Sequence, residues 1–159
     1  MFKIKKATIE DTEIIYNFIY KLAEYEKLID DVTTTPELLG KSLFGPNSNA
    51  ETLIGYFDEN PVAFALYFFN FSTFRGKRGL YLEDVFVLPE MRGKGFGKEL
   101  LKRLAQIAEE NDCARFEWSV LDWNKPAIDF YKRLGAIPMD DWTVYRLDEK
   151  GIENLANKN

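Results

Sequence analysis

The pattern of apolar and polar positions along the chain predicts a protein of mixed helices and strands. Apolar runs of strand character lie at residues 2–7, 52–57, 62–69, 80–87 and 115–121. Apolar residues three and four apart predict helices in the segments that follow Asp11, Thr35, Gly95 and Asn124. Residues 137–139 and 142–147 are expected to be closing strands, and residues 150–159 a polar tail. The expected order, β-α-α-β-β-β-α-β-α-β, is typical of an α+β (mixed α/β) fold.

The segment Arg92-Gly93-Lys94-Gly95-Phe96-Gly97, between a strand and an amphipathic helix, has the features of an anion site. Glycines permit positive φ angles and leave backbone N–H groups uncovered, and the N-terminus of the helix adds its dipole. We therefore expect a pyrophosphate at the amides of residues 93–98. A turn that only begins the helix is the alternative. The spacing matches neither a P-loop nor the dinucleotide-binding fingerprint.

Two other segments leave alternatives open. Residues 24–31 carry several carboxylates at a predicted helix end, where they oppose the helix dipole. A cation-binding role would explain this cost, and a solvated helix end is the alternative. Residues 70–79 read equally as a loop that borders a substrate channel or as a plain hairpin turn.

Composition narrows the possible chemistry. The 159 residues contain no histidine and one cysteine, Cys113, so neither a disulfide nor a thiolate metal cluster is expected. Without histidine, acid–base chemistry near neutrality must come from carboxylates, tyrosine, lysine or the thiol. The formal net charge of −5 argues against nucleic acid and suits a small cationic partner.

Length and hydropathy indicate a single domain over residues 1–159. The longest apolar run, residues 62–69, is too short to cross a membrane, and the first residues lack the apolar core of a signal peptide. We therefore expect a cytoplasmic protein that binds no membrane.

Arg92-x-x-Gly95-x-Gly97 after an apolar strand resembles the acetyl-CoA-binding motif of the GNAT superfamily of N-acetyltransferases. The segments Tyr81–Val87 and Asn124–Ala136 resemble its spermidine/spermine (diamine) acetyltransferase branch, and the likeness spans nearly the whole chain. The resemblance implies the GNAT acyl-CoA N-acyltransferase fold. That fold is a twisted, mixed, mostly antiparallel sheet whose central strands splay apart, with helices on both faces.

The resemblance also implies acetyl-CoA as co-substrate and no metal. The residues that would bind acetyl-CoA, by carry-over, are Val85, Phe86, Val87, Arg92, Gly93, Lys94, Gly95, Phe96, Gly97, Lys98, Asn124, Pro126, Ala127 and Tyr131. The pantetheine arm would pair with the backbone of residues 85–87 in the manner of an added strand. The Val85 N–H would polarise the thioester carbonyl.

For catalysis, the resemblance implies Tyr131 as general acid and Glu83 as general base, with Asp84 in support. From the residues alone, an ordinary salt bridge for Glu83 and a core position for Tyr131 are the alternatives. The residues expected to line the amine site are Tyr25, Glu26, Glu83, Asp84, Trp118 and Asp141. Between Ala136 and Trp142 the chain is shorter than the polyamine enzymes, so whether Asp140 or Asp141 contributes stays open.

The expected function is transfer of an acetyl group from acetyl-CoA to a primary amine of a small polyamine or diamine, such as spermidine or spermine, by direct attack. An acetyltransferase for thialysine, another amino acid or a protein amine is one alternative. A CoA-binding sensor or interaction module without turnover is the other. The resemblance further implies a homodimer.

Overall fold

The computed structural model describes residues 1–158 and divides into two compact units, Met1–Leu121 and the segment from Asp122 onward. The first unit contains β1 (Phe2–Lys6), α1 (Thr12–Tyr25), α2 (Pro36–Phe44), β2 (Glu51–Phe57), β3 (Asn60–Ser72), β4 (Lys77–Val87), α3 (Phe96–Glu110) and β5 (Arg115–Trp118). Short 3-10 turns, η1 (Ile9–Asp11), η2 (Ile29–Asp31) and η3 (Pro89–Met91), connect them. The second unit contains α4 (Lys125–Arg133) and α5 (Glu149–Ala156).

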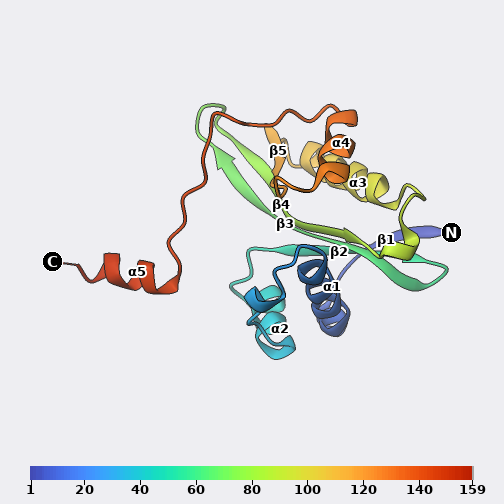
Figure 1. The fold of residues 1–159 in the computed structure, drawn as a ribbon, viewed down its shortest axis with the longest axis horizontal. Helices are drawn as coiled ribbons and strands as arrows, with labels where there is room; N and C mark the ends of the chain where they lie inside the picture. Colours follow the sequence, from blue (N-terminus) through green and yellow to red (C-terminus); the bar gives the residue numbers. More distant parts are fainter. Residues whose placement is uncertain (159) are drawn as a thin grey trace. The chain divides into compact units, whose positions relative to one another are not determined.

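The sheet has the order β1-β2-β3-β4-β5 (Figure 1). Pairs β1–β2, β2–β3 and β3–β4 are antiparallel, and β4–β5 is parallel because α3 carries the chain back across the sheet. The predicted α+β fold with a mostly antiparallel mixed sheet is thereby confirmed.

Helices cover both faces of this sheet, as expected: α1 and α2 lie on one face and α3 on the other (Figure 1). On the α1 face, the ring of Phe18 stacks on that of Phe64 at 5.2 Å, inside a cluster of buried apolar residues. On the opposite face, Phe96 at the start of α3 stacks on Phe2 at 4.2 Å. The central strand β3 is consequently buried on both faces.

Local sequence signals explain several element boundaries. Thr35 caps α2 by accepting a hydrogen bond from the Leu38 N–H, with Pro36 in the first turn. Asp58 and Glu59 both adopt positive φ, at 48° and 69°, as a two-residue β-hairpin requires. The helix expected after Thr35 is therefore confirmed, and a two-residue turn joins β2 to β3.

The segment of residues 70–79 is a tight hairpin and not a channel loop. β3 runs on to Ser72 and β4 begins at Lys77, so only four residues turn the chain. Pairing of Asn70 with Gly79 and of Ser72 with Lys77 continues the ladder almost to the tip. Of the two alternatives, the plain hairpin turn is correct.

The predicted closing strands at 137–139 and 142–147 are wrong, since the structure describes irregular chain there with a turn at Asp140–Asp141. An alternating apolar pattern forms a strand only where a neighbouring strand satisfies its backbone, and within the described residues none pairs with this segment. The expected polar tail is also wrong in part. Asp148 accepts a hydrogen bond from the Gly151 N–H at 2.8 Å and starts α5.

Candidate functional site

A β-bulge interrupts β4 at Glu83. Leu66 of β3 pairs with Asp84 and Tyr67 pairs with Leu82, so Glu83 is an extra residue with no partner opposite it. A bulge bends its strand and increases the local twist. Nothing in the local residue pattern marks this bulge, and the splayed central strands implied by the family resemblance are the sequence signal that agrees with it.

Beyond the bulge, β4 and β5 separate. Their parallel pairing runs from Gly79 with Arg115 to Leu82 with Trp118 and ends there, while β4 continues to Val87. The predicted strand to Leu121 therefore ends early, at Trp118, because β4 bends away from it. On this edge of β4, residues 83–87 pair with no strand among the described residues. Their backbone groups can pair with an extended ligand in place of a strand.

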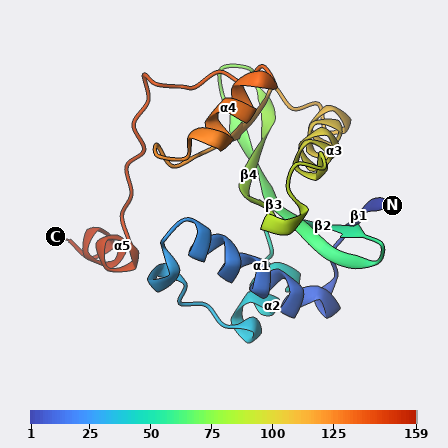
Figure 2. The same cartoon turned by 45° about the vertical axis from the view of Figure 1, so that its right-hand side comes forward.

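The glycine turn follows β4 and leads directly into α3 (Figure 2). Gly93 and Gly95 adopt φ angles of 78° and 86°, which only glycine adopts readily. Gly95 is the N-cap of α3, and no side chain among residues 1–158 caps the first amides of the helix. Those amides are free to bind an anion. Gly97, expected to share this conformation, instead lies in the first helical turn.

We expect Gly95→Val to raise the Kd for acetyl-CoA at least about tenfold, because a β-branched residue does not tolerate this φ and the turn must rearrange. Gly76, at the tip of the β3–β4 hairpin, is a matched control. It has a φ of 64° and, like Gly95, open space where a side chain would begin. Calorimetric titration should show a nearly unchanged Kd for Gly76→Val. Equal affinities of the wild type and Gly95→Val would contradict an anion site at this turn.

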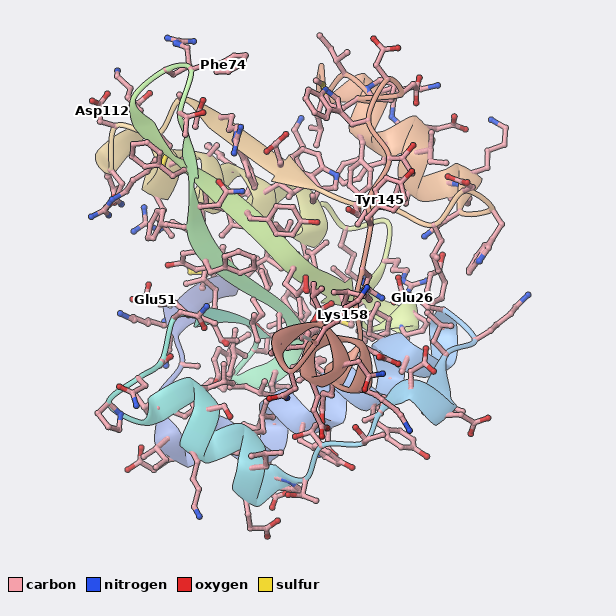
Figure 3. All side chains as sticks on the ribbon, turned by 90° about the vertical axis from the view of Figure 1, so that its left-hand side faces the viewer. Glu26, Glu51, Phe74, Asp112, Tyr145 and Lys158 are labelled. Atoms are coloured by element: carbon pink, nitrogen blue, oxygen red, sulfur yellow. The ribbon has the colours of Figure 1, made fainter. Side chains whose placement is uncertain are left out.

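Three acids gather near the bulge. Glu26 is the C-cap residue directly after α1 (Figure 3), and burial raises its pKa. Asp84 shares the α1 face of the sheet, since its β3 partner Leu66 belongs to the core on that face. Burial, followed by the negative charges of Glu83 and Glu26, raises the pKa of Asp84 to about 7. Glu83 itself is exposed.

Asp84 is thus the carboxyl whose charge changes near neutral pH. Sequence reasoning gave Glu83 the greater weight as a base, and strand alternation would have placed the two acids on opposite faces. The bulge changes that alternation, and the charges of Glu83 and Glu26 both act on Asp84. These three carboxyls together attract a cation. A cation bound beside Asp84 lowers the pKa of that carboxyl, which then loses its proton.

Two aromatic residues and one arginine lie close to these acids along the chain or in contact with each other: Tyr25 directly precedes Glu26, and Phe86 lies two residues beyond Asp84. The Arg92 guanidinium lies over the ring of Tyr25 at 4.6 Å and over that of Phe86 at 5.2 Å. The Arg92 Nε donates a hydrogen bond to the Val87 carbonyl at 3.0 Å. The sequence assigned Arg92 to the phosphates alone, and no spacing signal joins it to Tyr25, which lies far away in the chain.

Trp118 lies at the end of β5, where the two strands part, and its ring meets that of Phe116 edge-on at 4.9 Å. The next residue in the chain is Ser119. Its Oγ lies 2.9 Å from the Tyr81 hydroxyl oxygen, and the two hydroxyls share a hydrogen bond. Ser119 was not among the expected site residues. Only the register of β4 against β5 brings these two hydroxyls together.

The remaining expected residues belong to the second unit and are described within it. Asn124 is buried and caps α4 by accepting a hydrogen bond from the Ala127 N–H at 3.4 Å, and Pro126 lies in the first turn. Tyr131 lies in the last part of α4, its ring 5.7 Å from that of Phe130. Asp141 lies exposed in the turn before Trp142.

Between residues 1 and 158, no group of three histidine, cysteine, aspartate or glutamate side chains is placed to hold a metal ion. None of the helices in that range combines the length and apolar character that crossing a bilayer requires.

The open edge of β4, the uncapped start of α3 and the acidic cluster agree with what comparison with known proteins shows. Residues 14–136 match the model of the acetyltransferase (GNAT) family. A thialysine N-epsilon-acetyltransferase from Sus scrofa is 38% identical over 98% of this chain and 97% of its own. The human spermidine/spermine N(1)-acetyltransferase-like protein 1 is 32% identical over 98% of this chain but only 24% of its own.

Among solved structures, an integron cassette protein from the mobile metagenome of V. cholerae superposes with a TM-score of 0.82. It is 27% identical, and the match covers 98% of each chain. The family model spans most of the chain, and the similarity to the acetyltransferase relatives extends over nearly all of it. The chain therefore belongs to the acetyltransferase (GNAT) family, whose members transfer acetyl groups from acetyl-CoA to amines.

Proposed function

We propose that this protein transfers the acetyl group of acetyl-CoA to the side-chain amine of a small free amino acid of the thialysine type. The observation that carries the proposal is the open edge of β4 beyond the bulge, which runs from the acidic cluster to the glycine turn. An extended thioester bound along that edge would have its phosphates at the start of α3 and its acyl end beside the acids.

The residues present fit acetyl-CoA. Backbone groups of residues 85–87 would hold the pantetheine arm, and the first amides of α3 would hold the pyrophosphate. Lys94 and Lys98 are exposed cations in the same segment and would balance its charge. In the second unit, Asn124, Pro126, Ala127 and Tyr131 are the proposed contacts of α4 with the cofactor.

The choice of amine rests on the relatives. The Sus scrofa protein, similar over nearly its whole length, is named for thialysine, whereas the human polyamine-named protein is matched over a quarter of its length. A polyamine or diamine is the second candidate. The clustering of Glu26, Glu83 and Asp84 favours it, because several carboxylates suit an acceptor with more than one positive charge.

An amine must lose a proton before it attacks a carbonyl carbon, and a free alkyl amine has a pKa of about 10. Glu83, in the bulge, is the proposed acceptor of that proton, and Asp84 is the proposed anchor for the ammonium form. A cation bound beside Asp84 lowers its pKa from about 7, so the carboxyl ionises as the amine arrives. Tyr131 is the proposed donor of a proton to the departing thiolate.

Thiol release from acetyl-CoA with separate acceptors tests this proposal. We expect the largest kcat/KM with thialysine, lower values with lysine and ornithine, and the lowest with spermidine and a short diamine. A preference for spermidine would replace the amino acid by the polyamine. Binding of acetyl-CoA without turnover on any acceptor would favour a CoA-binding sensor or a protein substrate.

We further propose that the chain works as one acetyltransferase domain, as a cytoplasmic homodimer. The family match crosses the boundary between the two compact units, which supports a single functional domain. Light scattering of the purified protein at micromolar concentration gives the mass of the assembly directly. A monomer mass, 18.5 kDa, would contradict the dimer.

A further inference from the structure

The stack of Arg92 on Tyr25 and Phe86 joins parts of the chain that lie far apart in sequence. Tyr25 is the last residue of α1, Phe86 lies on β4, and Arg92 directly precedes the glycine turn. The two rings are also close to each other, with centroids 6.4 Å apart. One guanidinium therefore bridges the end of α1, next to Glu26, and the segment proposed to bind phosphates.

On the side of the amine site, this contact lies next to one of the acids. The ring that Arg92 covers belongs to the last residue of α1, and Glu26 follows it directly. Glu26 is near enough to Asp84 for its charge to raise the Asp84 pKa. A change in the position of Tyr25 consequently changes the field at both carboxyls.

On the side of the cofactor, Arg92 retains donors for an anion. Its Nε is used by the Val87 carbonyl, and no carboxylate among the described residues forms a salt bridge with it. The two terminal amino groups of the guanidinium remain, in the geometry that binds phosphate oxygens in pairs. Arg92 is exposed overall, so an anion can reach these two groups from solvent.

We infer that Arg92 is a positioning residue that couples the binding of acetyl-CoA to the binding of the amine. This inference rests on the proposed function. A pyrophosphate held by the guanidinium orders Arg92 over Tyr25, which in turn orders Glu26 and the acids of the amine site. The second ligand then binds to a site already arranged, so each ligand raises the affinity of the other by the same factor.

Calorimetric titration measures that factor. Thialysine is titrated into the wild-type protein with and without saturating coenzyme A, which binds at the cofactor site but cannot react. We expect its Kd to fall about fivefold or more when coenzyme A is present. The ratio of the Kd without coenzyme A to the Kd with it should approach one in two variants. These are Arg92→Lys, which keeps the charge but loses the planar stack, and Tyr25→Leu, which loses the ring.

Two variants separate this role from simpler ones. Lys94→Ala removes a cation from the same turn but touches neither ring, so it should weaken coenzyme A binding and leave the ratio at its wild-type value. Tyr25→Phe keeps the ring and should restore the ratio lost in Tyr25→Leu. Melting temperatures of all variants identify any that fail to fold, and the Tyr25→Phe result then decides the question.

A ratio of one in the wild type, or a wild-type ratio in a folded Arg92→Lys, would overturn the inference while leaving the acetyltransferase proposal intact. Failure of coenzyme A to bind the wild type would overturn both. Because the ratio compares two binding constants of the same protein, a general loss of affinity does not imitate a loss of coupling.

Discussion

Tyr131→Phe is expected to lower kcat about a hundredfold or more, with the Kd for acetyl-CoA changed less than about twofold. The substitution removes one hydroxyl and keeps the ring, so the contact with Phe130 on α4 and the cap by Asn124 persist. A phenol with a pKa of about 10 protonates a thiolate efficiently only when the transfer accompanies departure. Losing that proton should slow the chemical step alone.

Rapid-quench measurement of a single turnover, together with calorimetric titration of acetyl-CoA, separates these effects. Tyr145→Phe is a matched control in the same unit, since Tyr145 is 93% exposed (Figure 3) and has no proposed role. It should retain wild-type kcat. A Tyr131→Phe enzyme with unchanged kcat would show that water or another group supplies the proton.

Asp84→Asn is expected to stabilise the protein above neutral pH. In the folded chain the pKa of Asp84 is raised from 3.8 to about 7, mainly by burial, so the folded state binds a proton that the unfolded state releases. Stability contributed by the protonated form is therefore full below about pH 4 and is lost as pH rises towards 7. This shift corresponds to at most about 4 kcal/mol, and we expect roughly 2 kcal/mol at pH 8.

Urea unfolding at pH 5 and pH 8 tests this expectation. The gain in unfolding free energy should be largest at pH 8 and roughly a third as large at pH 5, because at pH 5 the unfolded chain has already released the proton that folded Asp84 retains. Glu83→Gln is the matched control, because it removes only one of the charges that act on Asp84, and its gain should be smaller. If Asp84→Asn instead lowers stability at pH 8, the carboxylate makes a favourable contact that outweighs its burial. If Asp84→Asn gains stability and loses turnover, the protein retains Asp84 for its function at a cost in stability.

Short-range patterns predicted the elements that depend only on their own residues. The spacing of Leu100, Leu101 and Leu104 predicts α3, and all three are buried. Thr35-Pro36 begins α2 as expected, and the strand–helix–strand order around α3 explains the parallel pairing of β5. Each of these features is determined by residues that are close to it in the sequence.

Features that depend on distant partners were not predictable in this way. The bulge at Glu83 arises from the register of β3 against β4, and the raised pKa of Asp84 arises from burial together with charges on β4 and at the end of α1. The predicted strand at 142–147 has the correct alternation but no neighbouring strand among the described residues. Conversely, α5 carries an ordinary cap signal at Asp148, and the polar composition of the segment obscured it.

The complete burial of Val62–Tyr67 in β3 has a consequence for how the chain folds. An uncharged apolar window with strand-forming residues associates readily with other chains while it is exposed. Its two neighbours, β2 and β4, flank it directly in the sequence through short turns, so it is covered by contacts of low sequence separation. The β2–β3–β4 meander can therefore form early and shield this strand during synthesis, before α3 and β5 complete the sheet.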